Sequence, residues 1–261
     1  MIEKWIFLNT GFRDGNFNMK FDEYIAFLFS KGKIKPILRV YGWKPYTISI
    51  GYNQDEKIFD FEKIRSSGLG FVRRPTGGRA VLHAEELTYS VVMNSGGKNV
   101  IEVYNIISRA IVRGLTSLGA EFELAQTEPD FPNLYKDFKS IPCFASSAKY
   151  EIQFKGKKIV GSAQRRFGDV VLQHGSILIG EYHKKLPEFL KLDSPEKIEK
   201  IKAEIEGKTI CLNEILNREV SFDEVAKALK RGFEEEFGIK FEDKDLFDVE
   251  FEIEKFDLVS L

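Results

Sequence analysis

The chain has 261 residues, of which 43% are hydrophobic and 13% aromatic, so it can bury a large core and is expected to be globular rather than disordered. Its 39 basic and 40 acidic residues leave a formal net charge of −1, which argues against a general attraction to nucleic acid or to a membrane surface. Two cysteines are too few for a disulfide framework or a thiolate metal cluster. With no secretory signal and no apolar run of about 18 residues, a soluble cytoplasmic protein is expected.

The first half of the chain predicts an opening helix followed mainly by strands. Asn18 is a candidate N-cap for that helix, and Gly32 marks its end. Strands are expected over 36–41, 46–52 and 87–93 and from 71 onward, with a short helix over 60–67. A long helix is predicted over 100–118, because apolar residues recur there at helical spacing and Gly119 supplies a C-cap.

The second half predicts a loop over 121–147, a hairpin made of 150–154 and 158–163, and a strand over 170–179. Ser194-Pro195 and the capping box that starts at Ser221 then open two helices. The predicted fold class is therefore α+β, a mixed β-sheet flanked by helices. We expect one catalytic domain over 1–261, of which 188–261 form a mainly helical C-terminal appendage.

Cys143 is the most informative residue, because it lies in a proline-containing loop rather than in an apolar run. A thiol attacks as its thiolate, and a nearby ammonium can lower a thiol pKa from about 8.5 into the working range. Lys158 follows across the predicted hairpin, at the start of its second strand. The pair suggests covalent acyl transfer. The alternative for Lys158 is a solvated turn lysine, whereas Cys211 is interpreted as an inert core residue.

The pair Gly77-Gly78 forms either a plain hairpin turn or a place where a substrate approaches the backbone closely. His83 and His174 are candidates to line the same cavity, and His183 is interpreted as a surface residue. No two histidines have metal-ligand spacing, so no metal site is expected. A cysteine–histidine dyad of protease type, with His83 or His174 as the base, remains an alternative. The adjacent Arg165-Arg166 are either solvated or receive an acidic protein or a phosphate group.

Five segments together resemble the lipoate-protein ligase and octanoyltransferase superfamily, which also contains the biotin-protein ligases. The segments are 73–83, 142–144, 150–151, 156–165 and 172–178. The cysteine segment is similar to the cysteine-type octanoyltransferase branch. One departure is Ala145-Ser146-Ser147, where that branch usually has Ala-Pro-Ser or a similar run.

The resemblance implies a cavity for a medium-length acyl chain and an acyl-thioester on Cys143, with Lys158 lowering the thiol pKa. Lys158 is also a candidate to take up the proton of the attacking amine. The donor implied is octanoyl-acyl carrier protein, and the acceptor is a lysine of the glycine cleavage H protein or of an E2 lipoyl domain. We expect a monomer without a cofactor. The residues assigned to substrate binding are Arg73, Arg74, Gly77, Gly78, His83, Gly161, Ser162, Ala163, Gln164, His174 and Gly175.

Three other functions stay open at this point. An ATP-dependent lipoate-protein ligase would share Lys158 and residues 73–83, the glycine segment that contains Gly77-Gly78, but would not need Cys143. A related cysteine enzyme would move octanoyl groups between lipoyl domains by amidotransfer. A degenerate member of the superfamily would bind an acyl group without catalysis.

Overall fold

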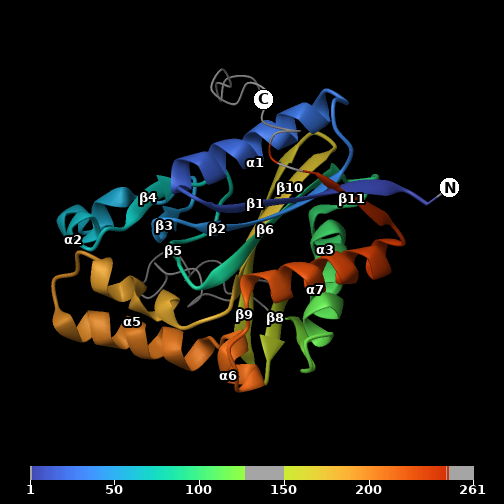
Figure 1. The fold of residues 1–261 in the computed structure, drawn as a ribbon. Helices are drawn as coiled ribbons and strands as arrows, with labels where there is room; N and C mark the ends of the chain where they lie inside the picture. Colours follow the sequence, from blue (N-terminus) through green and yellow to red (C-terminus); the bar gives the residue numbers. More distant parts are fainter. Residues whose placement is uncertain (1, 127–149, 245, 247–261) are drawn as a thin grey trace.

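The structure is a computed structural model that describes residues 2–126, 150–244 and 246. Its strands form two sheets that meet at an angle, with helices against their outer faces (Figure 1). The expected α+β class, a mixed sheet flanked by helices, is confirmed. Of the helices in these ranges, none is long and apolar enough to cross a membrane.

The main sheet contains eight of the described strands in the order β11-β1-β2-β6-β10-β9-β8-β7. The pairs β11–β1 and β1–β2 are parallel, and the remaining pairs are antiparallel. Strand β10 is buried along its whole length between β6 and β9, which makes it the centre of the sheet. The bounds are β1 (Lys4–Arg13), β2 (Ile37–Trp43), β6 (Glu86–Asn94), β7 (Glu123–Gln126), β8 (Tyr150–Phe154), β9 (Lys157–Phe167), β10 (Val170–Leu178) and β11 (Lys240–Lys244).

The small sheet consists of three strands in the order β4-β3-β5. Its apolar side chains pack with those of the neighbouring short helices into a second core of their own. The bounds are β3 (Thr47–Ile50), β4 (Gly70–Arg73), β5 (Val81–His83), η1 (Glu56–Ile58), α2 (Phe61–Ser66), η4 (Tyr182–Phe189) and α5 (Pro195–Lys208).

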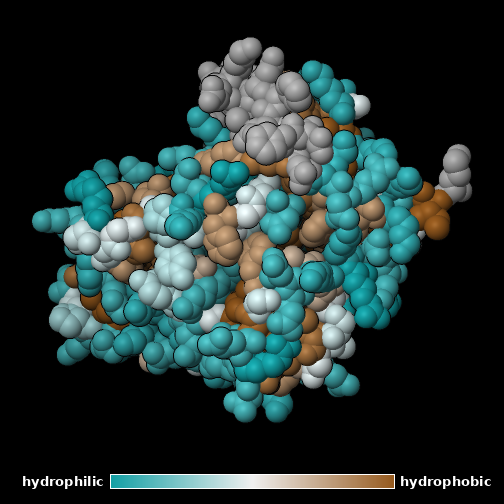
Figure 2. Space-filling model, viewed as in Figure 1, coloured by the Kyte–Doolittle hydropathy of each residue, from teal (hydrophilic) through white to brown (hydrophobic). Residues whose placement is uncertain are grey.

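Helices cover both faces of the main sheet. Helix α1 (Gly15–Ser30) packs on one face, and α3 (Val100–Thr116) and α7 (Phe222–Phe237) pack on the other (Figure 1). The surface in Figure 2 is mostly hydrophilic, as expected when the large apolar side chains are used in these cores. The two sheets meet beside α1, so this junction is the first place to look for a ligand site.

The start of α1 differs from the prediction. Asp14 is the N-cap, and its side chain accepts a hydrogen bond from the backbone N–H of Phe17. Asn18 lies inside the first turn and is fully buried, where its amide donates to the carbonyls of Arg13 and Gly42. Predicting Asn18 as the cap was therefore wrong, because its side chain is used in a tertiary contact.

The C-terminal part combines helices with one strand. After η4 come α5, α6 (Leu212–Leu216) and α7, and then β11 pairs with β1 at the edge of the main sheet. Helices α5 and α7 were predicted, whereas η4 and the short α6 were not. The strands β1, β7 and β11 were not predicted either. These three are edge or near-edge strands with weak alternation of apolar residues. The division of the chain into a catalytic domain and an appendage stays a prediction.

Two glycines let α3 and α7 approach each other closely. A Cβ at Gly232 would overlap the carbonyl oxygen of Ala110 and the backbone nitrogen of Gly114, and a Cβ at Gly114 would lie 2.6 Å from the carbonyl oxygen of Ala228. Backbone atoms in two packed helices cannot shift as a flexible side chain does. The contact between the helices therefore depends on glycine at both positions.

We predict that Gly232→Ala destabilises the protein although alanine is the better helix former. Overpacking a tight interface costs roughly 1–3 kcal/mol, which exceeds the gain in helix propensity of about 1 kcal/mol. Urea denaturation measures the change in free energy of unfolding. Gly207→Ala in α5 is the control, because a Cβ there meets no atom within 4 Å, and this variant should keep or raise stability. Equal stability of the two variants would contradict the prediction.

Candidate active site

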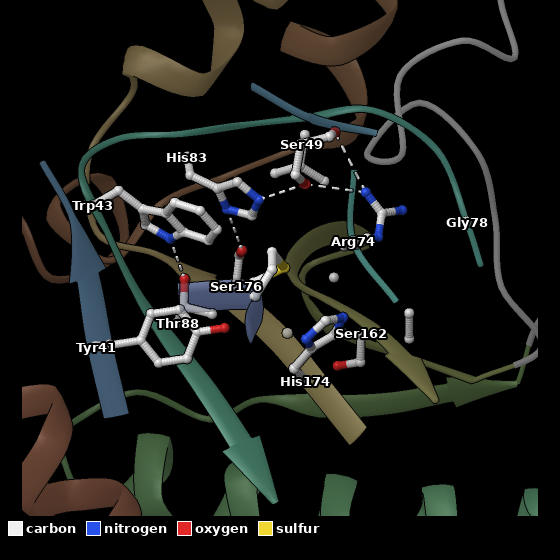
Figure 3. Close-up of a pocket in the computed structure, with 15 residues that line it drawn as sticks. Tyr41, Trp43, Ser49, Arg74, Gly78, His83, Thr88, Ser162, His174 and Ser176 are labelled. Carbon is white, nitrogen blue, oxygen red and sulfur yellow. Dashed lines mark hydrogen bonds between the residues drawn. The ribbon is translucent and has the colours of Figure 1, made fainter. Parts of the chain in front are cut away.

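A pocket lies where α1, the main sheet and the small sheet meet (Figure 3). Each of these elements contributes side chains to it, and the segment between β4 and β5 closes one side. The lining residues are Met19, Tyr41, Trp43, Ser49, Arg74, Gly78, Val81, His83, Thr88, Gly161, Ser162, Ala163, His174, Gly175 and Ser176. The pocket is therefore assembled from residues that are far apart in the sequence.

Eight of the residues predicted to bind substrate lie together around this pocket. They come from three separate segments, which the fold brings side by side: β9 pairs with β10, and the glycine segment packs over both. The eight are Arg74, Gly78, His83, Gly161, Ser162, Ala163, His174 and Gly175.

Three other predicted residues, Arg73, Gly77 and Gln164, do not line the pocket. The Arg73 guanidinium folds over the turn after β3, where it donates to three backbone carbonyls and pairs with Glu56 at 3.2 Å. Gln164 donates to Gln173 on the neighbouring strand at 3.0 Å. The Arg73 side chain therefore supports the backbone of that turn, and the Gln164 side chain binds a side chain of β10; neither lines the pocket.

The glycine segment is held by the side chain of Arg74. Its guanidinium donates to the carbonyls of Gly77 at 3.0 Å and Arg79 at 2.7 Å, and to the hydroxyl of Ser49 at 3.1 Å. A Cβ at Gly51 would overlap the carbonyl of Gly78, whose φ is +92°. Glycine is thus required on both sides of this close approach, which fixes the segment over the pocket.

Arg165 attaches the same segment to β9. Its guanidinium donates to the carbonyl of Pro75 at 3.0 Å and lies 5.4 Å from the centre of the exposed Tyr52 ring. The Arg165 side chain is therefore ordered by the protein rather than fully solvated. The acidic or phosphate ligand that the sequence left open for it stays a prediction.

Lys158 lies outside the pocket, at the start of β9, and is 6% exposed. The β8–β9 hairpin places its Nζ 2.9 Å from Oε1 of Glu151, which is also buried. A buried ion pair of this kind holds both side chains in fixed positions, because separating the charges is costly. Cys143 lies outside the described residues, so its predicted pairing with Lys158 stays a prediction.

His174 is held in one orientation by a buried carboxylate. Its Nδ1 lies 3.0 Å from Asp22 and its Nε2 lies 2.7 Å from the hydroxyl of Thr76. Burial alone would raise the pKa of Asp22, but the charge of Arg39 and the hydrogen bond from His174 outweigh it and lower the pKa. Burial also lowers the pKa of His174. A neutral His174 therefore donates to Asp22 and accepts from Thr76, in the glycine segment.

His83 has a matching arrangement on the other side of the pocket. Its Nε2 lies 2.7 Å from the hydroxyl of Ser49 (Figure 3). Its Nδ1 lies 2.7 Å from Glu86 Oε1. Burial would raise the pKa of Glu86, but His83 and two hydroxyl donors lower it. The Trp43 ring stacks on the imidazole with 4.0 Å between ring centres. The ring of His83 is thus fixed on every side.

Seven lining residues were not predicted: Met19, Tyr41, Trp43, Ser49, Val81, Thr88 and Ser176. A usable signal exists for the polar ones. Ser49, Thr88 and Ser176 are small hydroxyl residues within largely buried strands that also contain several apolar residues. Because strand side chains alternate between faces, such residues mark the face that meets a polar or hollow region. The apolar residues carry no signal that separates pocket lining from ordinary core.

Two predictions about single residues have opposite outcomes. His183 is buried rather than on the surface, because its ring nitrogens pair with the carbonyl of Gly180 at 3.2 Å and the hydroxyl of Thr209 at 3.0 Å. Burial lowers its pKa to about 4. Cys211 is a fully buried core residue as predicted, and burial raises its thiol pKa to about 12.

The pocket suits an apolar ligand with one polar end. Its imidazole, hydroxyl and guanidinium groups largely pair with one another, while Met19, Trp43 and Val81 present apolar surface. Among the residues that the structure describes, no three metal-ligating side chains come together. The arrangement fits an acyl chain lying against rings and aliphatic groups, with its carbonyl at the polar side.

The sequence of this chain is similar to those of known proteins. Residues 14–234 match the family model of the lipoyl protein ligase A/B catalytic domain. The chain is 40% identical over 251 residues to "Octanoyltransferase LipM" of Bacillus subtilis (strain 168), a match that covers 94% of this chain and 90% of that protein. The protein of the same name from Geobacillus kaustophilus (strain HTA426) is 41% identical over 247 residues, with 92% and 88% covered.

Solved structures show the same fold. The bipartite lipoate protein ligase from Thermoplasma acidophilum, described with its E2 lipoyl domain, has a TM-score of 0.78 at 24% identity and covers 97% of this chain and 91% of its own. A lipoate-protein ligase A bound with ATP has a TM-score of 0.73 at 24% identity, with 98% and 93% covered. From the sequence matches, this chain belongs to the lipoyl protein ligase A/B catalytic domain family, and it is an acyltransferase.

Proposed function

We propose that this protein transfers an octanoyl group to a lipoyl-carrier protein during lipoate biosynthesis. The observation that carries the proposal is the 40% identity, over 94% of the chain, to proteins named octanoyltransferase. The apolar pocket between the sheets supports it, because a medium-length acyl chain needs a cavity of this character. Octanoyl-acyl carrier protein is the proposed donor.

In the first half-reaction, the thiolate of Cys143 attacks the thioester carbonyl of the donor and forms a C–S bond to the octanoyl group. The C–S bond of the donor breaks, and the thiolate of the carrier protein leaves. Exchange between two thioesters is close to level in free energy, so this step needs a thiolate and stabilisation of the oxyanion but no ATP. The glycine segment over the pocket is the proposed oxyanion site, since backbone N–H groups at glycines can approach a carbonyl closely. Lys158 supplies the positive charge that keeps Cys143 ionised.

In the second half-reaction, the ε-amine of an acceptor lysine attacks the thioester and forms a stable amide. Such an amine has an ordinary pKa of about 10.4, so it must lose a proton before or during the attack. The proposed acceptor is the glycine cleavage H protein.

Cys143→Ser should lower octanoyl transfer by roughly 10³-fold or more, because a serine hydroxyl is a far weaker nucleophile than a thiolate at neutral pH. Intact-mass spectrometry after mixing with octanoyl-acyl carrier protein should show an octanoyl adduct on the wild type and none on the variant. Cys211→Ala is the matched control, because the buried Cys211 lies outside the pocket, and it should keep the adduct. Full transfer by Cys143→Ser would favour the ligase route, as would lipoylation from free lipoate and ATP.

Lys158 and Glu151 should shift the reactivity of Cys143 in opposite directions. Lys158→Ala should move the pH midpoint of alkylation by iodoacetamide upward by roughly 1–2 pH units, because a cation that favours the thiolate is lost. Glu151→Gln should move it downward, because a neighbouring negative charge is lost. Peptide mapping reads Cys143 separately from Cys211, whose raised pKa of about 12 makes it an unreactive internal reference. Unchanged midpoints in both variants would remove Lys158 from its proposed role.

The acceptor is tested by offering the wild type the H protein and several E2 lipoyl domains at equal concentrations. We expect octanoylation of the H protein to be the fastest, measured by the mass of each acceptor. Faster modification of an E2 domain would correct the acceptor while leaving the octanoyl chemistry intact. Transfer from an octanoylated domain, with no reaction from the acyl carrier protein, would instead identify an amidotransferase.

A further inference from the structure

The adjacent arginines Arg165 and Arg166 lie on opposite faces of the main sheet. Residues that are opposite each other in an antiparallel pair share a face, and Arg165 is opposite Leu172, which belongs to the core beside α1. Arg166 is opposite Val171, which belongs to the core that the sheet shares with α3 and α7. The side chain of Arg166 is therefore on the face that α3 and α7 cover (Figure 1), away from the glycine segment that Arg165 holds.

The guanidinium of Arg166 is buried without an acceptor. Its Nε and Nη2 atoms are both shielded from solvent, and neither has a hydrogen-bond partner among the described residues. Asp169, the acidic residue nearest to it in the sequence, accepts instead from the hydroxyl of Ser95 at 3.4 Å. A guanidinium stays charged at every physiological pH, so burying two of its donors unpaired costs free energy. A group that arrives with acceptors would remove this cost.

The two unpaired nitrogens of Arg166 form one edge of the guanidinium. The Nε–H bond and one N–H bond of Nη2 are parallel, and this edge fits two oxygens of one carboxylate or phosphate group. The residue as a whole is only partly buried, so its edge lies close to the surface. The sequence left open an acidic or phosphate ligand for this pair of arginines, and Arg166 is the one that has free donors for it.

Gln164 offers an unpaired acceptor on the same face, two residues before Arg166. Its Nε2 donates to Oε1 of Gln173 at 3.0 Å, and Nε2 of Gln173 donates to the hydroxyl of Tyr89 at 3.0 Å. This order fixes the orientation of both amides, because a reversed Gln164 would place two oxygens against each other. Oε1 of Gln164 is thus left buried with no partner among the described residues.

These groups match a carboxylate better than a phosphate. A carboxylate has one negative charge and two oxygens, which a single guanidinium edge pairs completely. A phosphate monoester has nearly two charges and three acceptor oxygens, and the neighbouring Oε1 of Gln164 is itself an acceptor. That oxygen instead needs a donor, such as a hydroxyl or an amide N–H next to the carboxylate.

We propose that Arg166 and Gln164 form a binding site for a carboxylate that has a hydrogen-bond donor beside it. The guanidinium edge holds both carboxylate oxygens, and Oε1 of Gln164 accepts from the donor. Two sources share this chemistry: a free hydroxy acid, and an aspartate or glutamate of a partner protein with its own backbone N–H. Neither residue lines the pocket, so the site is separate from it and does not depend on the proposed octanoyl transfer.

The site is tested first with sodium glycolate, which has a hydroxyl beside its carboxylate. Glycolate is compared with sodium chloride at equal ionic strength by thermal melting. At ten times its dissociation constant, glycolate should raise the melting temperature of the wild type by about 2–4 °C relative to chloride. Acetate, which lacks the hydroxyl, should need a higher concentration for the same shift. Arg166→Gln should lose the shift, and Arg166→Lys, which keeps the charge but not the fork, should lose most of it.

Arg109→Gln is the matched control, because it also removes one positive charge. Arg109 is an exposed residue of α3 that already pairs with Glu236 at 2.7 Å. Carboxylate salts stabilise proteins in general by exclusion from their surface, so the readout is the difference between Arg166→Gln and this control. In chloride alone, Arg166→Gln should melt at the same temperature as the wild type or higher, because a buried unpaired charge is removed. That measurement also verifies folding.

The two sources are distinguished with the H protein as the probe, by isothermal titration calorimetry. If a partner protein supplies the carboxylate, the H protein should bind Arg166→Gln roughly 10-fold more weakly than Arg109→Gln, and glycolate should compete. Equal binding to both variants, with the glycolate shift retained in the wild type, assigns the site to a free acid. A wild type that does not bind the H protein would count against the proposed acceptor, and the glycolate measurements would still decide the site.

The proposal is overturned if glycolate raises the melting temperature of Arg166→Gln as much as that of Arg109→Gln. It is also overturned if inorganic phosphate, at the same ionic strength, gives a larger shift that depends on Arg166 than glycolate gives. That result would make the site one for a phosphate group.

Discussion

The pocket depends on the compensation of two carboxylates that the fold has removed from water. Asp22 is fully buried and bonds the equally buried Arg39 at 2.7 Å, the hydroxyl of Tyr41 at 2.9 Å and His174 at 3.0 Å. Glu86 Oε1 pairs with His83 and accepts from the hydroxyls of Thr88 and Ser176, and these contacts lower the pKa of the carboxyl group. An unpaired charge in such a position costs several kcal/mol, roughly 3–5 when one partner of a buried pair is removed. The side chains that pair with Asp22 and Glu86 are therefore each held in a fixed position.

His174 and His83 connect these two carboxylates to the glycine segment and to the neighbouring strand β3. His174 accepts a hydrogen bond from the hydroxyl of Thr76, and His83 accepts one from the hydroxyl of Ser49. The guanidinium of Arg74 also donates to the Ser49 hydroxyl. Two residues of this segment, Arg74 and Thr76, are thus connected through a histidine to a carboxylate in the core. This arrangement accounts for a preorganised backbone at the place where an acyl carbonyl is expected, and preorganisation is what stabilises a developing oxyanion.

The sequence predicted the strands, helices and segments that carry strong local patterns. The hairpin of β8 and β9, the buried strand β10 and the helices α3 and α7 have clear periodicity or caps, and the predicted segments do meet at one pocket. The edge strands β7 and β11 could not be predicted, because their pairing depends on partners far along the chain. Asn18 was misplaced for the same reason, since a buried tertiary contact overrides its capping preference. Glu86 shows the same limit, because its partners His83, Thr88 and Ser176 are brought to it only by the folded chain.

In the proposed function, Lys158 has two electrostatic tasks in succession. Lys158 and Glu151 form a pair on the β8–β9 hairpin, away from the pocket lining, whereas His83 and Glu86 form a pair on the elements around the pocket. A fixed cation favours a thiolate, so the charged form of Lys158 suits the resting enzyme. Once Cys143 is acylated the thiolate is consumed, and a deprotonated lysine can then accept a proton from the attacking amine. The two tasks do not conflict, because they belong to different half-reactions, and the buried Glu151, which favours the charged lysine, sets how readily the second task begins.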